Sequence, residues 1–152
     1  MDLTLSPTSL NPIALRRGFI SSKAGAFTSF EGWVRDSNEG KTVVALEYEA
    51  YAPLCEKEAR KIFQEAKNAF DIIDMKMAHR TGKLKVGETA VWIGVLAAHR
   101  NDSFLACRYA IDELKKRLPI WKKEYYSNGE SGWVCCNHAH AQDPFPDPNR
   151  PI

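Results

Sequence analysis

The chain has no long apolar run and no paired-cysteine motif. Its longest apolar stretch, Ala90–Ala98, is far below the roughly 20 residues that span a bilayer. No basic start followed by an apolar block opens the 152 residues, and the four cysteines show no CxxC spacing. We therefore expect reduced thiols in a cytoplasmic protein that has no membrane partner.

An excess of one charge is also lacking. The 21 Lys and Arg residues face 19 Asp and Glu residues, which leaves a net charge of +2. This balance argues against a protein that coats nucleic acid, so the positions of the basic residues matter more than their number. GxGxxG, Walker A, HExxH and GxSxG motifs are absent, which disfavours many nucleotide-dependent, zinc-protease and hydrolase functions. We expect no resident cofactor.

One cluster near the C-terminus could suggest a zinc site. It consists of Cys135, Cys136, His138 and His140. Adjacent cysteines seldom bind one tetrahedral ion, and no second CxxC-like pair exists. We therefore favour a protein without a metal site, and we interpret Cys107 as core packing.

Proline is concentrated at the end of the chain, where residues 138–152 hold four of the eight prolines. Such a segment forms neither a helix nor a central strand, which predicts an extended, mobile tail. Residues 1–23 are polar and irregular, which predicts a flexible N-terminal arm. The folded domain is then expected over residues 24–137.

Apolar patterns inside this domain mix strands with helices. Strands are predicted over 24–35, 42–51, 73–77, 91–98, 119–126 and 132–137, and helices over 53–70 and 103–118. The second helix has an apolar stripe made of Phe104, Cys107, Ile111, Leu114 and Leu118. Asp102 or Ser103 can cap its start, and Pro119 ends it. The mixture predicts an α+β domain with a mostly antiparallel sheet.

The pair His99-Arg100 directly follows the apolar strand and precedes a helix. Free backbone N–H groups at the helix start, together with the planar guanidinium, make a good site for a phosphate group. The alternative is a salt bridge from Arg100 to a carboxylate, with His99 only capping the helix. Spacing alone does not decide between them.

A basic run ends the second helix and continues on the next strand. It consists of Lys115, Lys116, Arg117, Lys122 and Lys123. Cations at a helix C-terminus favour the helix dipole and usually face water. Two features favour a functional role for this run. Lys115 flanks the apolar stripe, and strand alternation places Lys122 on the face of Ile120, opposite Lys123. An amine in such a place can act as a proton donor, a base or a nucleophile.

A second His-Arg pair, His79-Arg80, precedes a predicted turn. We interpret it as a sheet-end histidine followed by a surface arginine.

Five separated segments resemble the molybdopterin synthase catalytic (large) subunit family. They read GAFTSFEGWVR at 25–35, LEYEAY at 46–51, HRTGKL and VGE within 79–88, AHR and SF within 98–104, and IDELK and PIWKKE within 111–124. They occur in the family's order across roughly residues 24–134. Several motifs in the correct order are far more specific than any one motif.

The resemblance implies an α/β hammerhead fold with a small additional antiparallel β subdomain. It implies a homodimer that binds two small ubiquitin-like sulfur carriers, which makes a heterotetramer. The carrier's Gly-Gly tail ends in a thiocarboxylate and supplies two sulfurs to cyclic pyranopterin monophosphate. The implied activity is therefore a sulfurtransferase in molybdenum cofactor biosynthesis.

The resemblance also implies roles for the matched residues. Arg35, His99 and Arg100 would hold the phosphate and the pterin. The pocket would further be lined by Trp33, Val34, Lys123 and Glu124. Lys115 would stabilise the thiocarboxylate and the developing oxyanion, or attack the acyl carbon, and Lys122 would donate a proton or stabilise charge.

One departure concerns the last strand. Relatives often carry an arginine a few residues after Trp-Val that reaches the other protomer, whereas here Trp133-Val134 is followed by Cys135, Cys136, Asn137 and His138. Either His138 substitutes or the contact is missing. Two non-catalytic alternatives also stay open: an anion- or nucleotide-binding module, and a scaffold that only binds the carrier protein.

Overall fold

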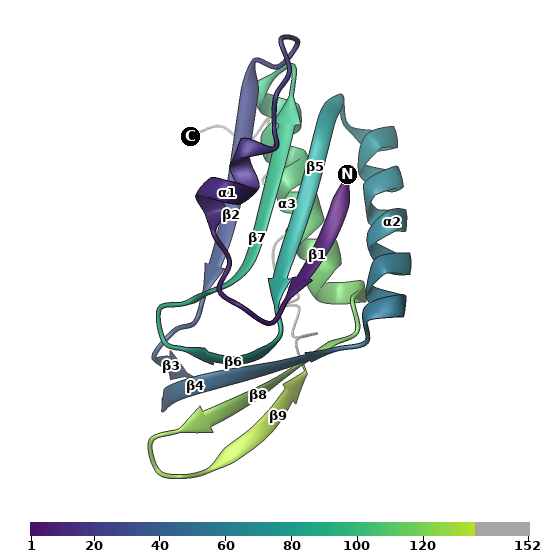
Figure 1. The fold of residues 1–152 in the computed structure, drawn as a ribbon. Helices are drawn as coiled ribbons and strands as arrows, with labels where there is room; N and C mark the ends of the chain where they lie inside the picture. The colour runs from purple at the N-terminus through teal and green to yellow at the C-terminus, as the bar shows by residue number, and fades with distance from the viewer. Residues whose placement is uncertain (136–152) are drawn as a thin grey trace, which may run out of the picture.

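The computed structural model describes residues 1–135, which form two β-sheets and three helices (Figure 1). The first sheet has the strand order β1–β5–β7–β2. Its strands are β1 (Asp2–Ser6), β2 (Ala26–Trp33), β5 (Ile72–Arg80) and β7 (Thr89–Ala97). β1 runs parallel to β5 and the other neighbours are antiparallel, so the prediction of a mostly antiparallel α+β fold is confirmed.

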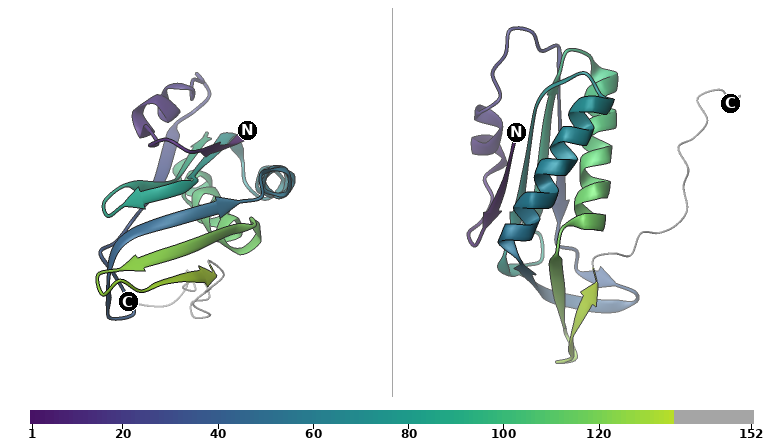
Figure 2. Two further views of the ribbon diagram at one scale, coloured as in Figure 1. Left: turned by 60° about the horizontal axis from the view of Figure 1, so that its bottom comes forward. Right: turned by 90° about the vertical axis from the view of Figure 1, so that its right-hand side faces the viewer.

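Helices lie on both faces of this sheet. The long helices α2 (Ala52–Ala69) and α3 (Arg100–Arg117) cover one face, and the short helix α1 (Pro12–Arg17) lies on the other (Figure 2). β7 is internal to the sheet and is buried from Ala90 to Ala97, as its continuous apolar run predicts.

The second sheet runs across one end of the first (Figure 1). Its strand order is β3–β4–β8–β9, and β6 also pairs with β4. These strands are β3 (Ser37–Asn38), β4 (Lys41–Ala50), β6 (Gly82–Lys85), β8 (Ile120–Tyr126) and β9 (Ser131–Cys135). All of their pairings are antiparallel, so this sheet corresponds to the predicted additional subdomain.

The core consists of two apolar clusters. The larger one lies between the first sheet and helices α2 and α3, and it contains Cys55 and Cys107. Both thiols are free, and burial raises the pKa of each to about 11, so the interpretation of Cys107 as core packing is confirmed. The smaller cluster lies under the second sheet around Leu46 and Leu84.

The prediction of an irregular N-terminal arm is wrong. Residues 2–6 form β1, which pairs in register from Asp2 with Lys76 to Ser6 with Arg80. Asn11 caps α1 by accepting a hydrogen bond from the backbone N–H of Ala14. The sequence gives no apolar pattern for this segment, because an edge strand and a surface helix bury little of their own surface and can be polar. The predicted tail, residues 138–152, lies outside the described residues.

Helix α3 starts three residues earlier than predicted. His99 occupies the N-cap position without a side-chain cap bond, and the Ser103 hydroxyl instead lies 2.7 Å from Thr28 Oγ1. The buried stripe therefore uses Ser103 and Ala106, and Phe104 is 62% exposed, contrary to prediction. The helix does end at Arg117, before Pro119, as predicted.

In β5 the register shifts between Ile72 and Asp74. Ile72 is buried, whereas Ile73, the first residue of the predicted strand, is exposed.

Candidate functional site

The five basic residues predicted to bind the substrates divide between two ends of the protomer. His99 and Arg100 lie at the start of α3, and Lys115 lies near its end. Arg100 and Lys115 are 15 residues apart (115 minus 100), which is about 22 Å along a helix that rises 1.5 Å per residue. One protomer alone therefore cannot bring these two residues to the same small substrate.

The strand directions place Arg35 at the same end of the molecule as Lys115. Trp33, at the end of β2, pairs with Thr89 at the start of β7, whereas Ala26 pairs with Ala97 at its other end. Arg35 follows Trp33, so it lies at the opposite end of β7 from His99 (Figure 1).

Lys122 is held by a buried carboxylate. Its Nζ lies 2.7 Å from Glu124 Oε1, and Glu124 is only 1% exposed. Two other donors fix the same carboxylate: Asn38 Nδ2, at 3.0 Å from Oε2, and the Tyr126 hydroxyl, at 2.8 Å from Oε2. Burial raises the pKa of Glu124, but the hydrogen bonds from Lys122, Tyr126 and Asn38 outweigh it and leave the pKa below its ordinary value. Lys122 thus faces a fixed anion.

His79 is a buried residue near this end of the sheet. It is the second-last residue of β5 with 6% of its surface exposed, and its ring packs edge-on against Tyr48 with centroids 4.9 Å apart. Tyr48 pairs with Lys122 across β4 and β8. The pKa of His79 is lowered to about 4, mainly because burial disfavours the charged ring; the hydrogen bond to the Arg80 carbonyl opposes this in part, and the positive charge of Lys115 adds a smaller lowering. His79 therefore contacts the cross-strand neighbour of Lys122, and the charge of Lys115 acts on its ring.

Arg80 is not the predicted surface residue, since it is only 4% exposed. Its Nη1 lies 3.2 Å from Glu88 Oε1, and its Nη2 donates to the carbonyl oxygen of Lys83. The same Glu88 carboxylate accepts from Ser9, so Arg80 helps to fasten the N-terminal segment.

Lys123 lies on the opposite face of β8 from Lys122, as alternation predicts. Its Nζ lies 5.2 Å from the centre of the Tyr125 ring and 5.8 Å from that of Trp133. The structure therefore does not bring Lys123 together with Lys115 and Lys122 within one protomer.

Trp33 and Val34 are neighbours with opposite surroundings. Trp33 is 65% exposed, and its indole N–H donates to Glu31 Oε2 at 3.1 Å. Val34 is buried in the smaller core cluster. Of the four residues predicted to line the pocket, Val34 and Glu124 thus lie behind the protein surface.

In the rest of the basic run, only Arg117 joins two helices within residues 1–135. Arg117 contacts Glu58, Glu65 and Glu113 at 3.1, 2.6 and 3.2 Å, and so joins the end of α3 to α2. Lys116 is largely exposed beside Glu113. Lys115 is also exposed, although it flanks the apolar stripe, so Arg117 is the least solvated of the three. Lys115 has no carboxylate partner within residues 1–135, because no ion pair there includes it.

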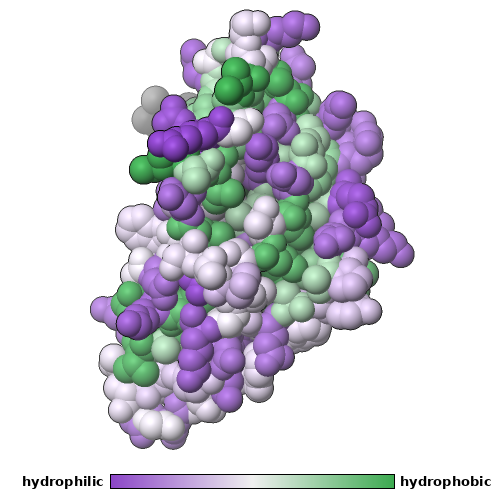
Figure 3. Space-filling model, in the orientation of Figure 1, coloured by the Kyte–Doolittle hydropathy of each residue, from purple (hydrophilic) through white to green (hydrophobic). Residues whose placement is uncertain are grey.

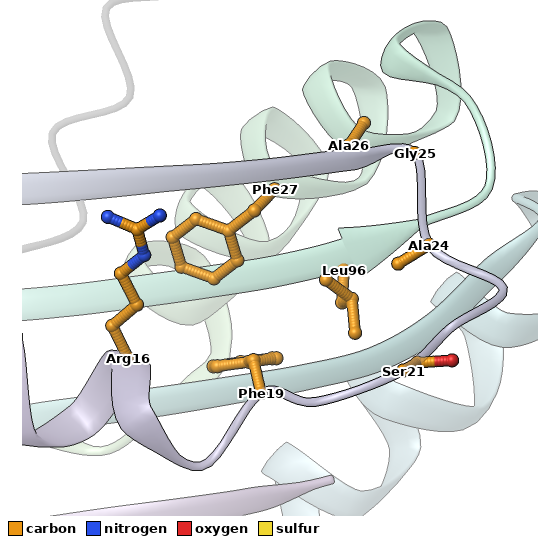
Figure 4. A pocket seen from close by; sticks show the side chains of 8 residues that line it. All are labelled: Arg16, Phe19, Ser21, Ala24, Gly25, Ala26, Phe27 and Leu96. Carbon is orange, nitrogen blue, oxygen red and sulfur yellow. The ribbon is translucent and has the colours of Figure 1, made fainter.

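A pocket of about 320 Å³ lies elsewhere, on the α1 side of the first sheet (Figure 4). Arg16 contributes the only ionisable group to its lining and stacks over Phe27 at 5.2 Å. The surface on this side mixes hydrophilic and hydrophobic side chains (Figure 3). This pocket contains none of the residues predicted from the sequence.

Within the described chain, no group of three or more His, Cys, Asp or Glu residues could hold a metal ion. Cys136, His138 and His140 lie outside residues 1–135, as does the proposed substitution by His138. No helix in the described part is long and apolar enough to cross a membrane.

The sequence profile of the MoaE protein family matches residues 4–117. This chain belongs to the MoaE family. The molybdopterin synthase catalytic subunit of Synechococcus elongatus is 43% identical over 136 residues, which cover 88% of this chain and 81% of that protein. The crystal structure of molybdopterin synthase from Staphylococcus aureus matches with a TM-score of 0.79 and 34% identity, over 88% of this chain and 95% of that chain.

A complex of subunits 1 and 2 of the Helicobacter pylori molybdopterin-converting factor contains a chain that matches with a TM-score of 0.72. It covers 90% of this chain and 91% of that chain, and at 21% identity it shows a common fold alone. Together, the comparisons confirm the predicted family, the fold class and an enzyme of molybdenum cofactor biosynthesis.

Several residues of the candidate site were not found from the sequence. His79 was interpreted as a sheet-end residue, and Tyr48, Asn38 and Tyr126 were not singled out. Alternation could have placed Tyr48 on the face of Leu46, but it could not show that both lie opposite Lys122 and Glu124. That information is in the pairing register between distant strands.

Proposed function

We propose that this MoaE-family chain is the catalytic subunit that converts cyclic pyranopterin monophosphate to molybdopterin. Two sulfurs come from the thiocarboxylated C-terminus of a small sulfur-carrier subunit. The observation that carries the proposal is that Lys115, near the end of α3, and Lys122, near the start of β8, lie at one end of the protomer, with Arg35 at the same end. Such a group of cations suits two anionic reactants that must approach each other.

The two lysines have different surroundings, which suits different roles. Lys122 is paired with a buried carboxylate, so its position is fixed and its charge is largely compensated. Lys115 has no carboxylate partner in residues 1–135, so its charge is available to a ligand. Lys115 stabilises the carrier's thiocarboxylate and the oxyanion at its acyl carbon, or attacks that carbon. Lys122 donates a proton or stabilises developing charge.

Each transfer must balance at the acyl carbon. The thiocarboxylate sulfur bonds to a pterin carbon and displaces an oxygen substituent, which leaves as water or, when the cyclic phosphate opens, as the phosphate oxygen. Water then adds to the acyl carbon of the resulting thioester, the acyl C–S bond breaks, the sulfur stays on the pterin as a thiolate, and the carrier tail ends as a carboxylate. An oxyanion forms on the carbonyl oxygen before the C–S bond breaks, and a positioned ammonium stabilises it. The reaction involves no oxidant.

The phosphate-binding residues require a second protomer. His99 and Arg100 are exposed and lie about 22 Å from Lys115 along α3. We infer a homodimer in which this pair from one protomer faces Lys115 and Lys122 of the other. With one small subunit at each site, the assembly is a heterotetramer. The relative from Synechococcus elongatus is named a catalytic subunit, which supports a companion subunit. We place the enzyme in the cytoplasm, where its thiols stay reduced.

The test mixes the purified chain with the thiocarboxylated carrier and cyclic pyranopterin monophosphate and measures the dithiolene product. We expect product with the wild type and almost none with Lys115→Ala. Lys116→Ala is the matched control, because Lys116 lies one residue further on and is largely exposed, and it should keep full activity.

Lys115→Arg separates an enzyme from a pure anion-binding module, since arginine keeps the charge but stays protonated. A binder should tolerate this change, whereas proton transfer or nucleophilic attack by the amine should not. Full activity of Lys115→Ala would contradict the proposed mechanism. Carrier binding by the wild type without any turnover would favour the scaffold alternative.

A further inference from the structure

The pocket on the α1 side of the first sheet contains none of the residues of the proposed function. Its volume of about 320 Å³ is at the lower end of the range for small-molecule sites. Arg16 and Ser21 contribute the polar side chains of its lining, and the other lining residues are apolar or glycine. No carboxylate from residues 1–135 lines it. The pocket therefore combines one cation with an apolar interior.

The aromatic wall of this pocket is held in place by its neighbours. Phe19 packs edge-on against Phe27 with ring centroids 5.1 Å apart, and it lies 6.1 Å from the ring of the buried Trp92. Gly94 makes room for this arrangement, because a Cβ there would overlap the Trp92 ring and lie 3.0 Å from that of Phe19. The ammonium of Lys76 lies 5.0 Å from the centre of the Phe19 ring. The rings thus form a fixed surface.

The loop that forms the other end of the pocket is tied to β7. The backbone N–H of Gly25 donates to the carbonyl oxygen of Ala97 at 3.1 Å, and a Cβ at Gly25 would lie 2.5 Å from the carbonyl oxygen of Ala98. Glycine permits this close approach. Ser21 Oγ accepts from the backbone N–H of Lys23 at 3.2 Å, and no hydrogen bond within residues 1–135 uses its hydrogen. The Ser21 hydroxyl can therefore donate to a ligand.

The cation at the pocket has no counter-ion in the described part of the chain. The guanidinium of Arg16 lies 5.2 Å from the centre of the Phe27 ring. Ion pairs within residues 1–135 are formed by three other arginines, namely Arg80, Arg108 and Arg117. A guanidinium that stacks on a ring keeps N–H groups at its edge, and these can donate to an anion. Arg16 therefore gives the pocket a preference for negative charge.

We propose that this pocket binds a small anion with a flat aromatic body. The aromatic part contacts Phe19, Phe27 and Leu96, and its anionic group accepts from Arg16. Arg16 stands beside Phe27 at one end of the pocket, and Ser21 lies at the other, where it donates to a polar substituent (Figure 4). A polar anion alone would leave the rings uncovered, and a neutral apolar molecule would desolvate Arg16 without a partner. This site is independent of the proposed sulfur transfer.

The test compares naphthoate with naphthamide, two probes that share their rings and differ in charge. Each is titrated into the purified chain, and the backbone amide shifts are followed by NMR. We expect naphthoate to shift the amides of Ser21, Gly25 and Leu96, with a Kd of about 1 mM or below, the strength expected for about 13 non-hydrogen atoms. Naphthamide should bind about fivefold more weakly, because it lacks the charge that Arg16 recognises.

Two arginine substitutions distinguish a defined site from general attraction by positive charge. Arg16 and Arg17 are both exposed in the last turn of α1, and of the two only Arg16 lines the pocket. Arg16→Gln should weaken naphthoate about fivefold, to the level of naphthamide, whereas Arg17→Gln should leave both probes unchanged. Ala24→Leu places a larger side chain in the pocket and should weaken both probes. Thermal unfolding verifies that each variant is folded.

Equal binding of naphthoate and naphthamide to the wild type would overturn the proposal, and this comparison needs no variant. Equal weakening of naphthoate by the two arginine substitutions would also overturn it, because the effect would then come from net charge. Shifts confined to residues outside the pocket would contradict it as well, since the probe would bind elsewhere.

Discussion

The two ends of helix α3 differ in how much of their surroundings one protomer supplies. At the C-terminal end, Arg117 joins three carboxylates and His79 is enclosed beside Lys115. At the N-terminal end, His99 and Arg100 are exposed, and no ion pair within residues 1–135 includes either. The first end is preorganised by the fold itself. The second end presents two exposed basic side chains to which the residues within 1–135 contribute no ion-pair partner.

We therefore expect mutations at the C-terminal end of α3 to lower stability, and mutations at its N-terminal end to affect only activity. Groups at the C-terminal end are desolvated and depend on one another, so removing one leaves others unpaired. Substituting the exposed cations at the N-terminal end should change the free energy of unfolding little.

Glu124→Gln should produce the largest loss of stability. The substitution removes the anion that Lys122 contacts at 2.7 Å, and leaves Asn38 and Tyr126 with a neutral partner. We expect the free energy of unfolding to fall by about 2–3 kcal/mol, measured by urea denaturation. The control is Glu130→Gln, which removes an exposed pair with Lys41 and should cost less than about 0.5 kcal/mol. Equal losses in the two variants would show that the buried pair stabilises the fold no more than the exposed pair does.

The pH dependence of stability tests the burial of His79. Its pKa is lowered from 6.5 to about 4 on folding, so the unfolded chain binds the proton more readily. The stability that the buried, neutral ring contributes is fully present above pH 6.5 and is lost as the pH falls toward 4. Between pH 7 and 5 the free energy of unfolding falls by about 2 kcal/mol. Denaturant titrations should therefore show a smaller loss in His79→Gln than in the wild type. An identical pH dependence would mean that His79 titrates normally.

Arg117→Met should have the smallest of these effects. The guanidinium is 20% exposed and joins α2 to α3 through Glu58, Glu65 and Glu113. Because the network is partly solvated, we expect a loss of about 1–2 kcal/mol in the free energy of unfolding. Lys116→Met, at the neighbouring exposed position, should change it by less than about 0.5 kcal/mol. If Arg117→Met left the free energy of unfolding unchanged, the apolar core alone would stabilise this end of the helix.

Much of this architecture was predictable because local patterns decide it. Alternation placed Lys122 with Ile120 and apart from Lys123, and the proline at 119 fixed the end of α3. The apolar run after Ala90 predicted a strand covered on both faces. In each case the deciding interaction is between residues close in the chain.

The rest depends on contacts that no local pattern contains. Asp2–Ser6 reads as polar and irregular, yet it completes a sheet by pairing with a strand more than 70 residues away. Phe104 fits an apolar stripe, but at this level the helix packs on β2 through Ser103, which bonds to Thr28, and Phe104 is left exposed. His79 became part of the site only through the register that brings Tyr48 opposite Lys122.

The central claim is that a working site combines Lys115 of one protomer with Arg100 of another. The most direct test mixes two variants, Lys115→Ala and Arg100→Ala, each nearly inactive alone, after dissociation and reassociation. Half of the random dimers are hybrids, and each hybrid regains one intact site of two, so the account predicts about a quarter of wild-type product formation. If the mixture stays as inactive as its components while hybrid dimers form, the two residues do not act across protomers and the account is contradicted.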